Sequence, residues 1–183
     1  KGNAYVSNWG GRRPAPGDAT GPAGRGTEVR VDPVTYIANE GSVSVIDLTS
    51  GKVGEEVLVQ RHASALAVTP DSRHVVCANA ASDNLSVIDT ATDKVVETIW
   101  VKQSPADIFG ASPNALAFDT KGKKLYVANG TQNAIAVIAF KPGKSKLLGL
   151  IPVGWFPGAL AFHAKRNLLC VANIKGISDV TQL

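Results

Sequence analysis

A short segment recurs along the chain at a nearly constant spacing, and this repeat limits the folds that the chain can adopt. The complete copies are Ser64–Asn79, Asn114–Asn129 and Gly158–Asn173, and a partial copy, Ala4–Asn8, lies near the start. Each complete copy has an Ala-Leu-Ala triplet near its beginning and ends in Ala-Asn. Short apolar strands that recur at a fixed period are typical of a β-propeller, in which each repeat forms one blade.

The repeat unit has the length of a four-stranded blade. Asp47 and Asp89 occupy equivalent positions and are 42 residues apart, which fits four strands per unit. One complete unit spans 64–101, with strands predicted, from the centre outward, over 65–68, 74–78, 85–89 and 94–101. We therefore expect an all-β fold, a propeller fragment of about three four-stranded blades. The predicted blades cover about 1–60 (with a long loop over 9–40), 61–101 and 113–153, and a fourth begins at about 157 and continues to 183.

Three blades cannot close a ring, so the sequence indicates a piece of a larger propeller. The chain contains no methionine and its first predicted strand starts at Ala4, which fits a processed or truncated product. Such a wedge leaves unpaired strand edges at Ala4–Asn8 and Leu168–Asn173, and exposed edges pair readily with further strands. We expect the remaining blades of the same propeller as partners, either on a second chain or on a second copy.

Composition excludes several other classes of function. A net charge of +4 is only mildly basic, and the lysines lie mainly in predicted turns. No basic stripe is interleaved with exposed aromatic residues, so we expect no nucleic-acid partner. No apolar segment is long enough to cross a bilayer, so we expect no membrane span. Cys77 and Cys170 align with adjacent strand positions, which point to opposite faces, and we expect two buried free thiols.

The usual motifs of catalysis and metal binding are incomplete in this sequence. The glycine-rich segment Gly21–Gly26 lacks the Gly-Lys-Ser/Thr ending of a phosphate-binding loop and indicates a surface loop. The three histidines are dispersed, which predicts no metal site. The inner strands carry alanine where a channel metal would need carboxylates, and we expect no cofactor. Asp47 and Asp89 fit the first position of a tight turn ending in the left-handed conformation.

Two insertions are predicted at the same end of the propeller. The first blade has about 29 extra residues between its second and third strands, and a second insertion covers about 102–112. In an antiparallel blade these two connections emerge on one rim, and function concentrates on loops held by a rigid scaffold. Aromatic and arginine side chains suit the docking of a domain, a peptide or an anionic ligand. The alternative is that Trp9 and Trp155 only pack the long loop against the rim. The candidate binding residues on this rim are Trp9, Arg12, Arg13, Arg61, His62, Trp155 and Phe156.

Several of these segments resemble a known family. Tyr126–Asn129, Ser86–Asp89 and Pro113–Ala117 resemble the YVTN-type bacterial β-propeller repeats. Tyr5–Pro14, Gly41–Asp47 and Ile151–Pro157 are similar to the branch in which the propeller precedes an alkaline-phosphatase-like phosphoesterase domain. The resemblance implies about seven blades in the whole protein, export to the periplasm or the extracellular space, and metal-binding residues that lie in the other domain.

On this basis we expect a non-catalytic propeller scaffold that binds a partner domain, protein or substrate within an exported phosphoesterase-like protein. The active site would then lie in the phosphoesterase domain, and this chain would itself be no enzyme. Two alternatives stay open at this point. One is a catalytic or cofactor-associated propeller of the lactonase or dehydrogenase type. The other is a surface-layer or adhesion module that binds other copies of itself.

Overall fold

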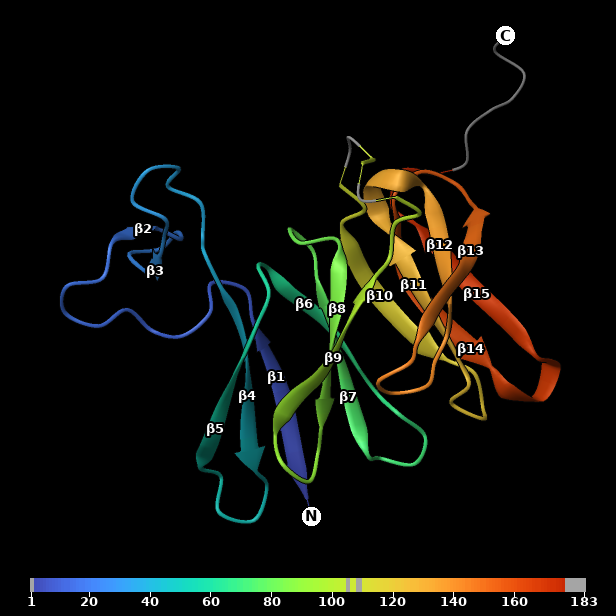
Figure 1. The fold of residues 1–183 in the computed structure, drawn as a ribbon, viewed down its shortest axis with the longest axis horizontal. Coiled ribbons are helices and arrows are strands. Elements are labelled where there is room, and N and C mark those ends of the chain that lie inside the picture. Colours follow the sequence, from blue (N-terminus) through green and yellow to red (C-terminus); the bar gives the residue numbers. More distant parts are fainter. Residues whose placement is uncertain (1, 105, 108–109, 177–183) are drawn as a thin grey trace, which may run out of the picture.

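The computed structural model describes residues 2–104, 106–107 and 110–176, and shows antiparallel sheets arranged as blades (Figure 1). The first sheet has the order β1 (Asn3–Asn8), β4 (Gly41–Asp47) and β5 (Val53–Val59). The second contains β6 (Ala63–Val68), β7 (His74–Asn79), β8 (Asn84–Asp89) and β9 (Lys94–Trp100). The third contains β10 (Pro113–Phe118), β11 (Lys124–Asn129), β12 (Ala134–Ala139) and β13 (Lys146–Pro152). The all-β blade architecture is confirmed.

The remaining elements are shorter. The strands β14 (Pro157–His163) and β15 (Leu168–Asn173) pair as the first two strands of the next blade. The final part of the predicted fourth blade, 177–183, lies outside the described residues. Two short 3₁₀ helices, η1 (Gly130–Gln132) and η2 (Ala164–Arg166), each end at an asparagine in the left-handed region. No helix within the described ranges has the length and apolar character needed to cross a membrane.

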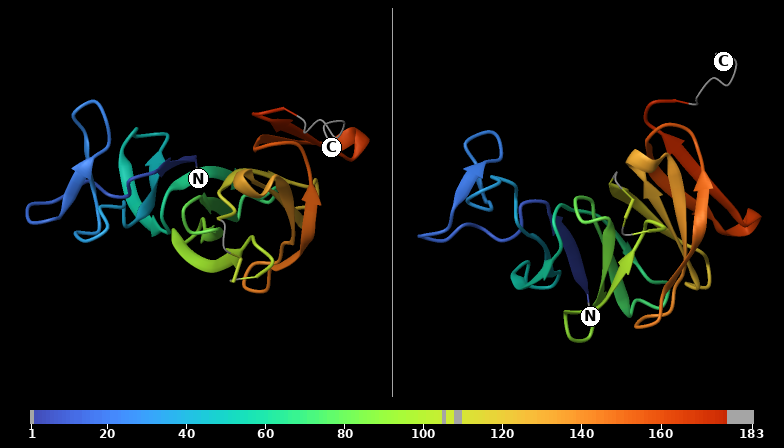
Figure 2. Two further views of the ribbon diagram at one scale, coloured as in Figure 1. Left: turned by 90° about the horizontal axis from the view of Figure 1, so that it is seen from above. Right: turned by 45° about the horizontal axis from the view of Figure 1, so that its top comes forward.

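The blades meet along their innermost strands. β10 lies between β6 and β14, whereas the outer strands β9 and β13 diverge (Figures 1 and 2). Alanine alternates with larger residues along β6, β10 and β14, and its small side chain permits this close approach around an axis. Each blade pairs its strands in chain order, so the β7–β8 type of connection and the connection into the next blade emerge at the same end.

The third-to-fourth strand turns have the predicted form. Asp47 Oδ1 accepts hydrogen bonds from the backbone N–H groups of Thr49 and Ser50, at 2.9 and 2.7 Å. Asp89 Oδ1 does the same for Ala91 and Thr92, at 2.9 and 3.0 Å. These hydrogen bonds stabilise the charged carboxylate and hold the pKa of both aspartates below the ordinary value. Both turns end in the left-handed region, at Gly51 and Asp93. These aspartates therefore have a structural role.

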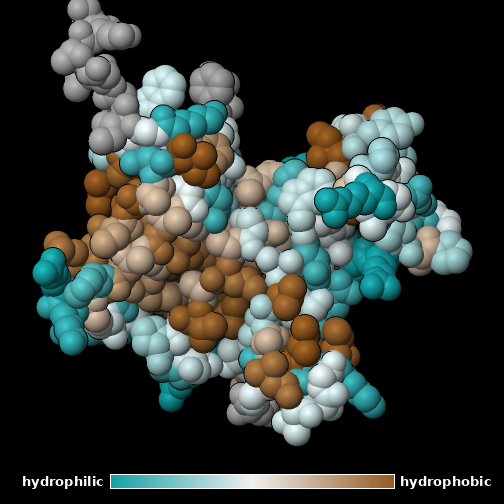
Figure 3. Space-filling model, turned by 180° about the vertical axis from the view of Figure 1, so that it is seen from behind, coloured by the Kyte–Doolittle hydropathy of each residue, from teal (hydrophilic) through white to brown (hydrophobic). Residues whose placement is uncertain are grey.

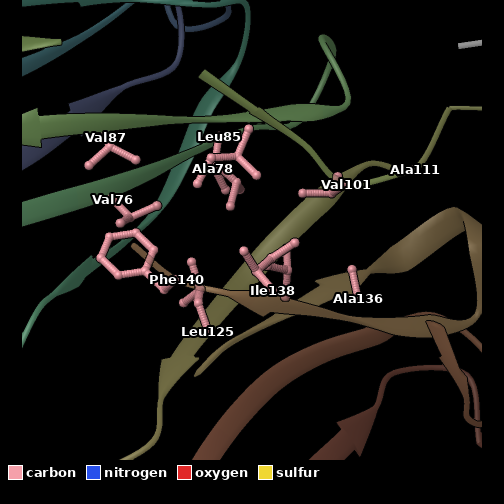
Figure 4. Close-up of a cluster of buried hydrophobic side chains, with 12 residues drawn as sticks. Val76, Ala78, Leu85, Val87, Val101, Ala111, Leu125, Ala136, Ile138 and Phe140 are labelled. Atoms are coloured by element: carbon pink, nitrogen blue, oxygen red, sulfur yellow. The ribbon is translucent and has the colours of Figure 1, made fainter. Parts of the chain in front are cut away.

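Hydrophobic layers between neighbouring blades form the core. The largest lies between the second and third blades, where Leu85 and Val87 of β8 face Leu125 of β11 and Ile138 of β12 (Figure 4). These four side chains are fully buried. A second layer joins the first two blades through Val43, Val57, Val75 and Ile88, among others. Burial of a side chain of this size stabilises the fold by about 1.5–3 kcal/mol relative to exposure.

Apolar surface remains exposed on the side of the molecule that carries β10–β15 (Figure 3). On β14 and β15, alternate residues differ in burial, because one face packs on the third blade and the other face is open. Ala159, Ala161 and Ala172 lie on the open face. Cys170 lies there too and is exposed, so the expectation of two buried thiols is wrong for this residue. Cys77 is buried, which raises the pKa of its thiol to about 12.

The first insertion contains more structure than the sequence predicts. It leaves the end of β1 and projects away from the blades (Figures 1 and 2). Within it, β2 (Thr20–Pro22) and β3 (Glu28–Arg30) form a small hairpin. The glycine-rich segment Gly21–Gly26 supplies one strand and the turn of this hairpin. The described part of the second insertion lies at the same end of the blades (Figure 1).

One glutamate joins the second and third blades at their outer strands. The carboxylate of Glu97, in β9, accepts hydrogen bonds from Gly143 N at 3.0 Å, from Ser145 N at 2.7 Å and from Ser145 Oγ at 2.8 Å. These donors lie in the turn between β12 and β13, so one side chain fixes the neighbouring blade.

We expect Glu97→Ala to lower the free energy of unfolding by about 1–3 kcal/mol, because three donors lose a charged acceptor. Chemical denaturation measures this change. Glu55→Ala is the matched control, since Glu55 is an exposed glutamate on the outer strand β5. Equal losses for both variants would contradict the role of Glu97 as a clamp between blades.

Candidate functional site

The same backbone conformation recurs at the entrance to three blades. His62, Ser112 and Phe156 immediately precede the inner strands β6, β10 and β14, and their φ angles are 57°, 50° and 53°. The carbonyl groups of these residues accept hydrogen bonds from the N–H groups of the second-to-third strand connections, at Ala80 (2.9 Å), Gly130 (3.1 Å) and Ile174 (2.9 Å). We call this repeated contact the entrance latch. It fixes the backbone next to the axis while the side chain differs in each blade.

His62 occupies the entrance of the second blade. Its ring stacks on the indole of Trp9, with the ring centroids 4.4 Å apart and the planes at 29°. Burial, followed by the neighbouring Arg61 charge, lowers the pKa of His62 below its ordinary value of 6.5. Both causes disfavour the charged form. Both effects favour the neutral form of His62 at pH 7, and a neutral imidazole can accept a proton from water or from a substrate.

The entrance of the third blade lies beside this histidine. Ser64 Oγ donates a hydrogen bond to Pro113 O at 3.1 Å, which ties the beginning of β6 to the beginning of β10. Asp83 Oδ1 accepts from the backbone N–H groups of Ala111 at 2.6 Å and Ser112 at 3.2 Å, and Asp83 also pairs with Lys102 at 3.4 Å. The backbone around Ser112 is therefore rigid. In β10, the buried Oδ1 atom of Asn114 has no hydrogen-bond partner within the described residues.

Arg61 supplies a positive charge next to His62. Its side chain is exposed and forms no ion pair with any described residue, while its backbone N–H donates to Ser82 Oγ at 3.1 Å. Arg61 also lines a cavity of about 260 Å³ between the first insertion and the second blade. The other lining residues are Asp32, Thr35, Ile37 and Asn39. A guanidinium beside a neutral imidazole can stabilise negative charge that develops during a reaction.

The entrance of the fourth blade is aromatic. Trp155 is half-exposed, and its backbone N–H donates to Gly176 O at 2.9 Å. Phe156 N donates to Asn133 Oδ1 at 2.9 Å. The ammonium group of Lys175 lies 5.6 Å from the centroid of the Phe156 ring, a cation–π contact that the sequence does not reveal.

The two remaining candidate residues lie in the first insertion. Arg12 Nε pairs with Glu40 Oε1 at 3.1 Å, so its charge is directed to the insertion and not to the blade entrances. Arg13 is exposed and forms no ion pair among the residues that the structure describes. The structure thus brings together Trp9 and His62, places Arg61 next to His62, and pairs Arg12 with Glu40 of the insertion. Whether the candidate residues bind a ligand stays a prediction.

Within the described ranges, no three His, Cys, Asp or Glu side chains are grouped as they would be around a metal ion. The three histidines lie apart: His74 begins β7, and His163 ends β14, where its Nδ1 accepts from Arg166 N at 3.2 Å.

Comparison with known proteins identifies the family of the chain. Residues 28–173 match the family described as lactonase, 7-bladed beta-propeller. No curated protein matches the chain. Among solved structures, a protein from Lactobacillus plantarum is similar with a TM-score of 0.61 and 20% identity, over 93% of this chain and 55% of that chain. Hydrazine synthase from Kuenenia stuttgartiensis gives a TM-score of 0.54 and 17% identity, over 73% of this chain and 52% of that one.

A third similar structure is a putative 6-phosphogluconolactonase from Bacteroides uniformis, with a TM-score of 0.51 and 17% identity. It is matched over 67% of this chain and 40% of its own length. The chain thus spans about half the length of these solved proteins, and at this identity they show the fold alone. The family match is to lactonases, so the expectation of a non-catalytic scaffold is wrong, and the lactonase-type alternative is the better supported one. The chain belongs to the lactonase family of seven-bladed β-propellers.

Proposed function

We propose that the protein containing this chain hydrolyses a lactone, a cyclic ester. The observation that carries the proposal is the family match over 28–173, a range that includes the second-blade entrance with Arg61 and His62. The geometry of that entrance supports it, because an imidazole whose neutral form is favoured lies next to a guanidinium that has no ion-pair partner among the described residues.

Each of the two side chains has a role in the proposed reaction. His62 removes a proton from water while the water oxygen forms a bond to the lactone carbonyl carbon. Arg61 stabilises the negative charge on the carbonyl oxygen in the tetrahedral intermediate. When the ring C–O bond breaks, protonated His62 returns the proton to the leaving oxygen. One lactone and one water thus give one hydroxy acid, with no further reactant.

The test is acid release by the purified full protein with a panel of five- and six-membered lactones, followed with a pH indicator. We expect saturable hydrolysis of at least one ring size above the uncatalysed rate. A panel hydrolysed only at the uncatalysed rate would contradict the proposal. Arg61→Ala should lower the rate by about 10²–10³-fold if the guanidinium stabilises the oxyanion, whereas Arg73→Ala, an exposed arginine at the β6–β7 turn, should not.

Three finer expectations from the sequence stay predictions. These are the link to the phosphoesterase-associated branch, the periplasmic or extracellular location, and the remaining blades as partners. The open face of β14 and β15, on which Ala159, Ala161 and Ala172 are exposed, supports the last of these. Native and denaturing mass measurement of the isolated protein, with cell fractionation, would test all three together.

A further inference from the structure

Trp9 is the aromatic stacking partner of the His62 imidazole. The indole covers one side of the imidazole at 4.4 Å, and about half of the Trp9 surface, 49%, stays exposed. Within the described part of the chain, the ring nitrogens of His62 form no hydrogen bond, although its backbone is fixed by the entrance latch. The stacking contact is therefore the specific side-chain interaction that the described residues provide to orient the ring.

The first insertion holds Trp9 from the other side. Trp9 is followed by a turn in which Gly11 N donates to Asn8 O at 3.1 Å. Gly10 packs so closely on Val29 of β3 that no Cβ would fit there. Gly11 has a φ of +74°, and a Cβ at this position would collide with the side chain of Glu40. The hairpin and the end of the insertion thus both pack against the turn that follows Trp9.

An ion network makes this support rigid. Arg30 Nε pairs with Asp18 Oδ2 at 2.9 Å, and Arg30 Nη1 pairs with Glu40 Oε2 at 2.6 Å. Glu40 also pairs with Arg12 Nε at 3.1 Å. The Arg30, Asp18 and Glu40 side chains are partly buried, with 15–19% of their surface exposed, and the network connects the beginning of the insertion with its end.

We propose that Trp9 is a positioning residue that fixes the His62 imidazole at the blade entrance, and that the 9–40 insertion holds Trp9 in place. The catalytic consequence rests on the proposed lactone hydrolysis, whereas the positioning itself does not. Aromatic stacking of this geometry is favourable beyond the area that it buries, and small displacements of a catalytic group reduce rates strongly. In this proposal the insertion serves the site through Trp9.

The charged side chains around His62 allow the effect of Trp9 on the pKa of His62 to be measured separately. Arg61 is the charged side chain that acts on His62. Arg12, the next cation after Trp9, is paired with Glu40, and Asp83 on the neighbouring connection is paired with Lys102. Asp32 lines the cavity with Arg61, and its Oδ1 accepts from the N–H groups of Val34 and Thr35. Trp9 carries no charge, so a shift in the titration of His62 on its replacement is expected to report the loss of the indole.

The first experiment is an NMR titration of His62 in the full protein, with His62→Gln used for assignment. We expect Trp9→Ala to raise the pKa of His62 towards 6.5, because the ring becomes hydrated, and Trp9→Phe to leave it near the wild-type value. An unchanged His62 titration in Trp9→Ala would overturn the proposal. This measurement needs no turnover, so it stands apart from the proposed reaction.

The second experiment compares kinetics. With a hydrolysed lactone, Trp9→Ala should lower kcat by about tenfold with KM little changed, because a misplaced base slows the chemical step. Arg30→Met should also lower kcat. Arg25 is an exposed arginine at the hairpin turn, so Arg25→Met should leave kcat unchanged. A wild-type kcat for Trp9→Ala would overturn the catalytic part, and equal effects of Arg30→Met and Arg25→Met would overturn the role of the insertion. If the wild type hydrolyses no lactone but the titration shifts, the positioning holds and the reaction is wrong.

Discussion

His62→Gln is expected to reduce kcat for lactone hydrolysis by about 10²–10⁴-fold, the usual contribution of a general base. Glutamine preserves the approximate size and polarity of the side chain but cannot accept the proton from water. The wild-type kcat/KM should rise with pH through the pKa of His62, because only the neutral imidazole is active. Since burial and Arg61 lower this pKa, the acid limb of the profile should lie below pH 6.5. Initial rates between pH 4.5 and 8 measure both effects.

The matched control is His163→Gln. His163 is an exposed histidine at the end of β14, away from the blade entrances, and its ring accepts a hydrogen bond from Arg166 N. This variant should retain the wild-type kcat and the wild-type pH profile. A fully active His62→Gln variant, or an acid limb that persists in it, would assign the base to another residue.

Leu125→Ala is expected to lower the free energy of unfolding by about 2–5 kcal/mol, because it removes a fully buried side chain and leaves a cavity. Leu125 lies in the layer between the second and third blades, with Val87 and Ile138 (Figure 4). The substitution should therefore weaken the packing between the two blades as well as the stability of the sheet that contains Leu125. Urea denaturation followed by circular dichroism measures the change.

Leu168→Ala provides the comparison for this prediction. Leu168 begins β15 and is half-exposed, so its removal should change the free energy of unfolding by no more than about 0.5 kcal/mol. The two variants make the same chemical change in equivalent strands. Similar losses in both would mean that the layer between the blades is not the main source of stability.

The blades could be predicted from the sequence because the repeat combines several independent signals. The strand pattern and the terminal asparagine recur in each blade, the aspartate turn recurs in the first two, and the spacings of about 42–50 residues each fit one blade. The β2–β3 hairpin could not be predicted, since its strands have three residues each. Its position depends on long-range contacts, above all the ion pairs of Arg30 with Asp18 and Glu40, and these have no local sequence signal.

The candidate site was only partly predictable for a related reason. Alignment places Trp9, Arg61 and His62 at one rim, but the stacking of Trp9 on His62 depends on a turn fixed by the insertion. The shared backbone conformation of His62, Ser112 and Phe156 is invisible in the sequence, because these side chains have little chemistry in common. The inference to a non-catalytic scaffold failed because alanine on the inner strands argues only against a carboxylate-held metal on the axis. A general base at the rim needs no such residues.

The entrance latch has a consequence for how such a protein can acquire new activities. The hydrogen bonds at Ala80, Gly130 and Ile174 are accepted by backbone carbonyls, so they do not depend on which side chain occupies the entrance. A histidine, a serine and a phenylalanine all adopt the required conformation. Folding and chemistry are thereby decoupled at these positions. The fold thus offers equivalent positions for side chains that tolerate the left-handed conformation, whereas a β-branched residue would be strained there.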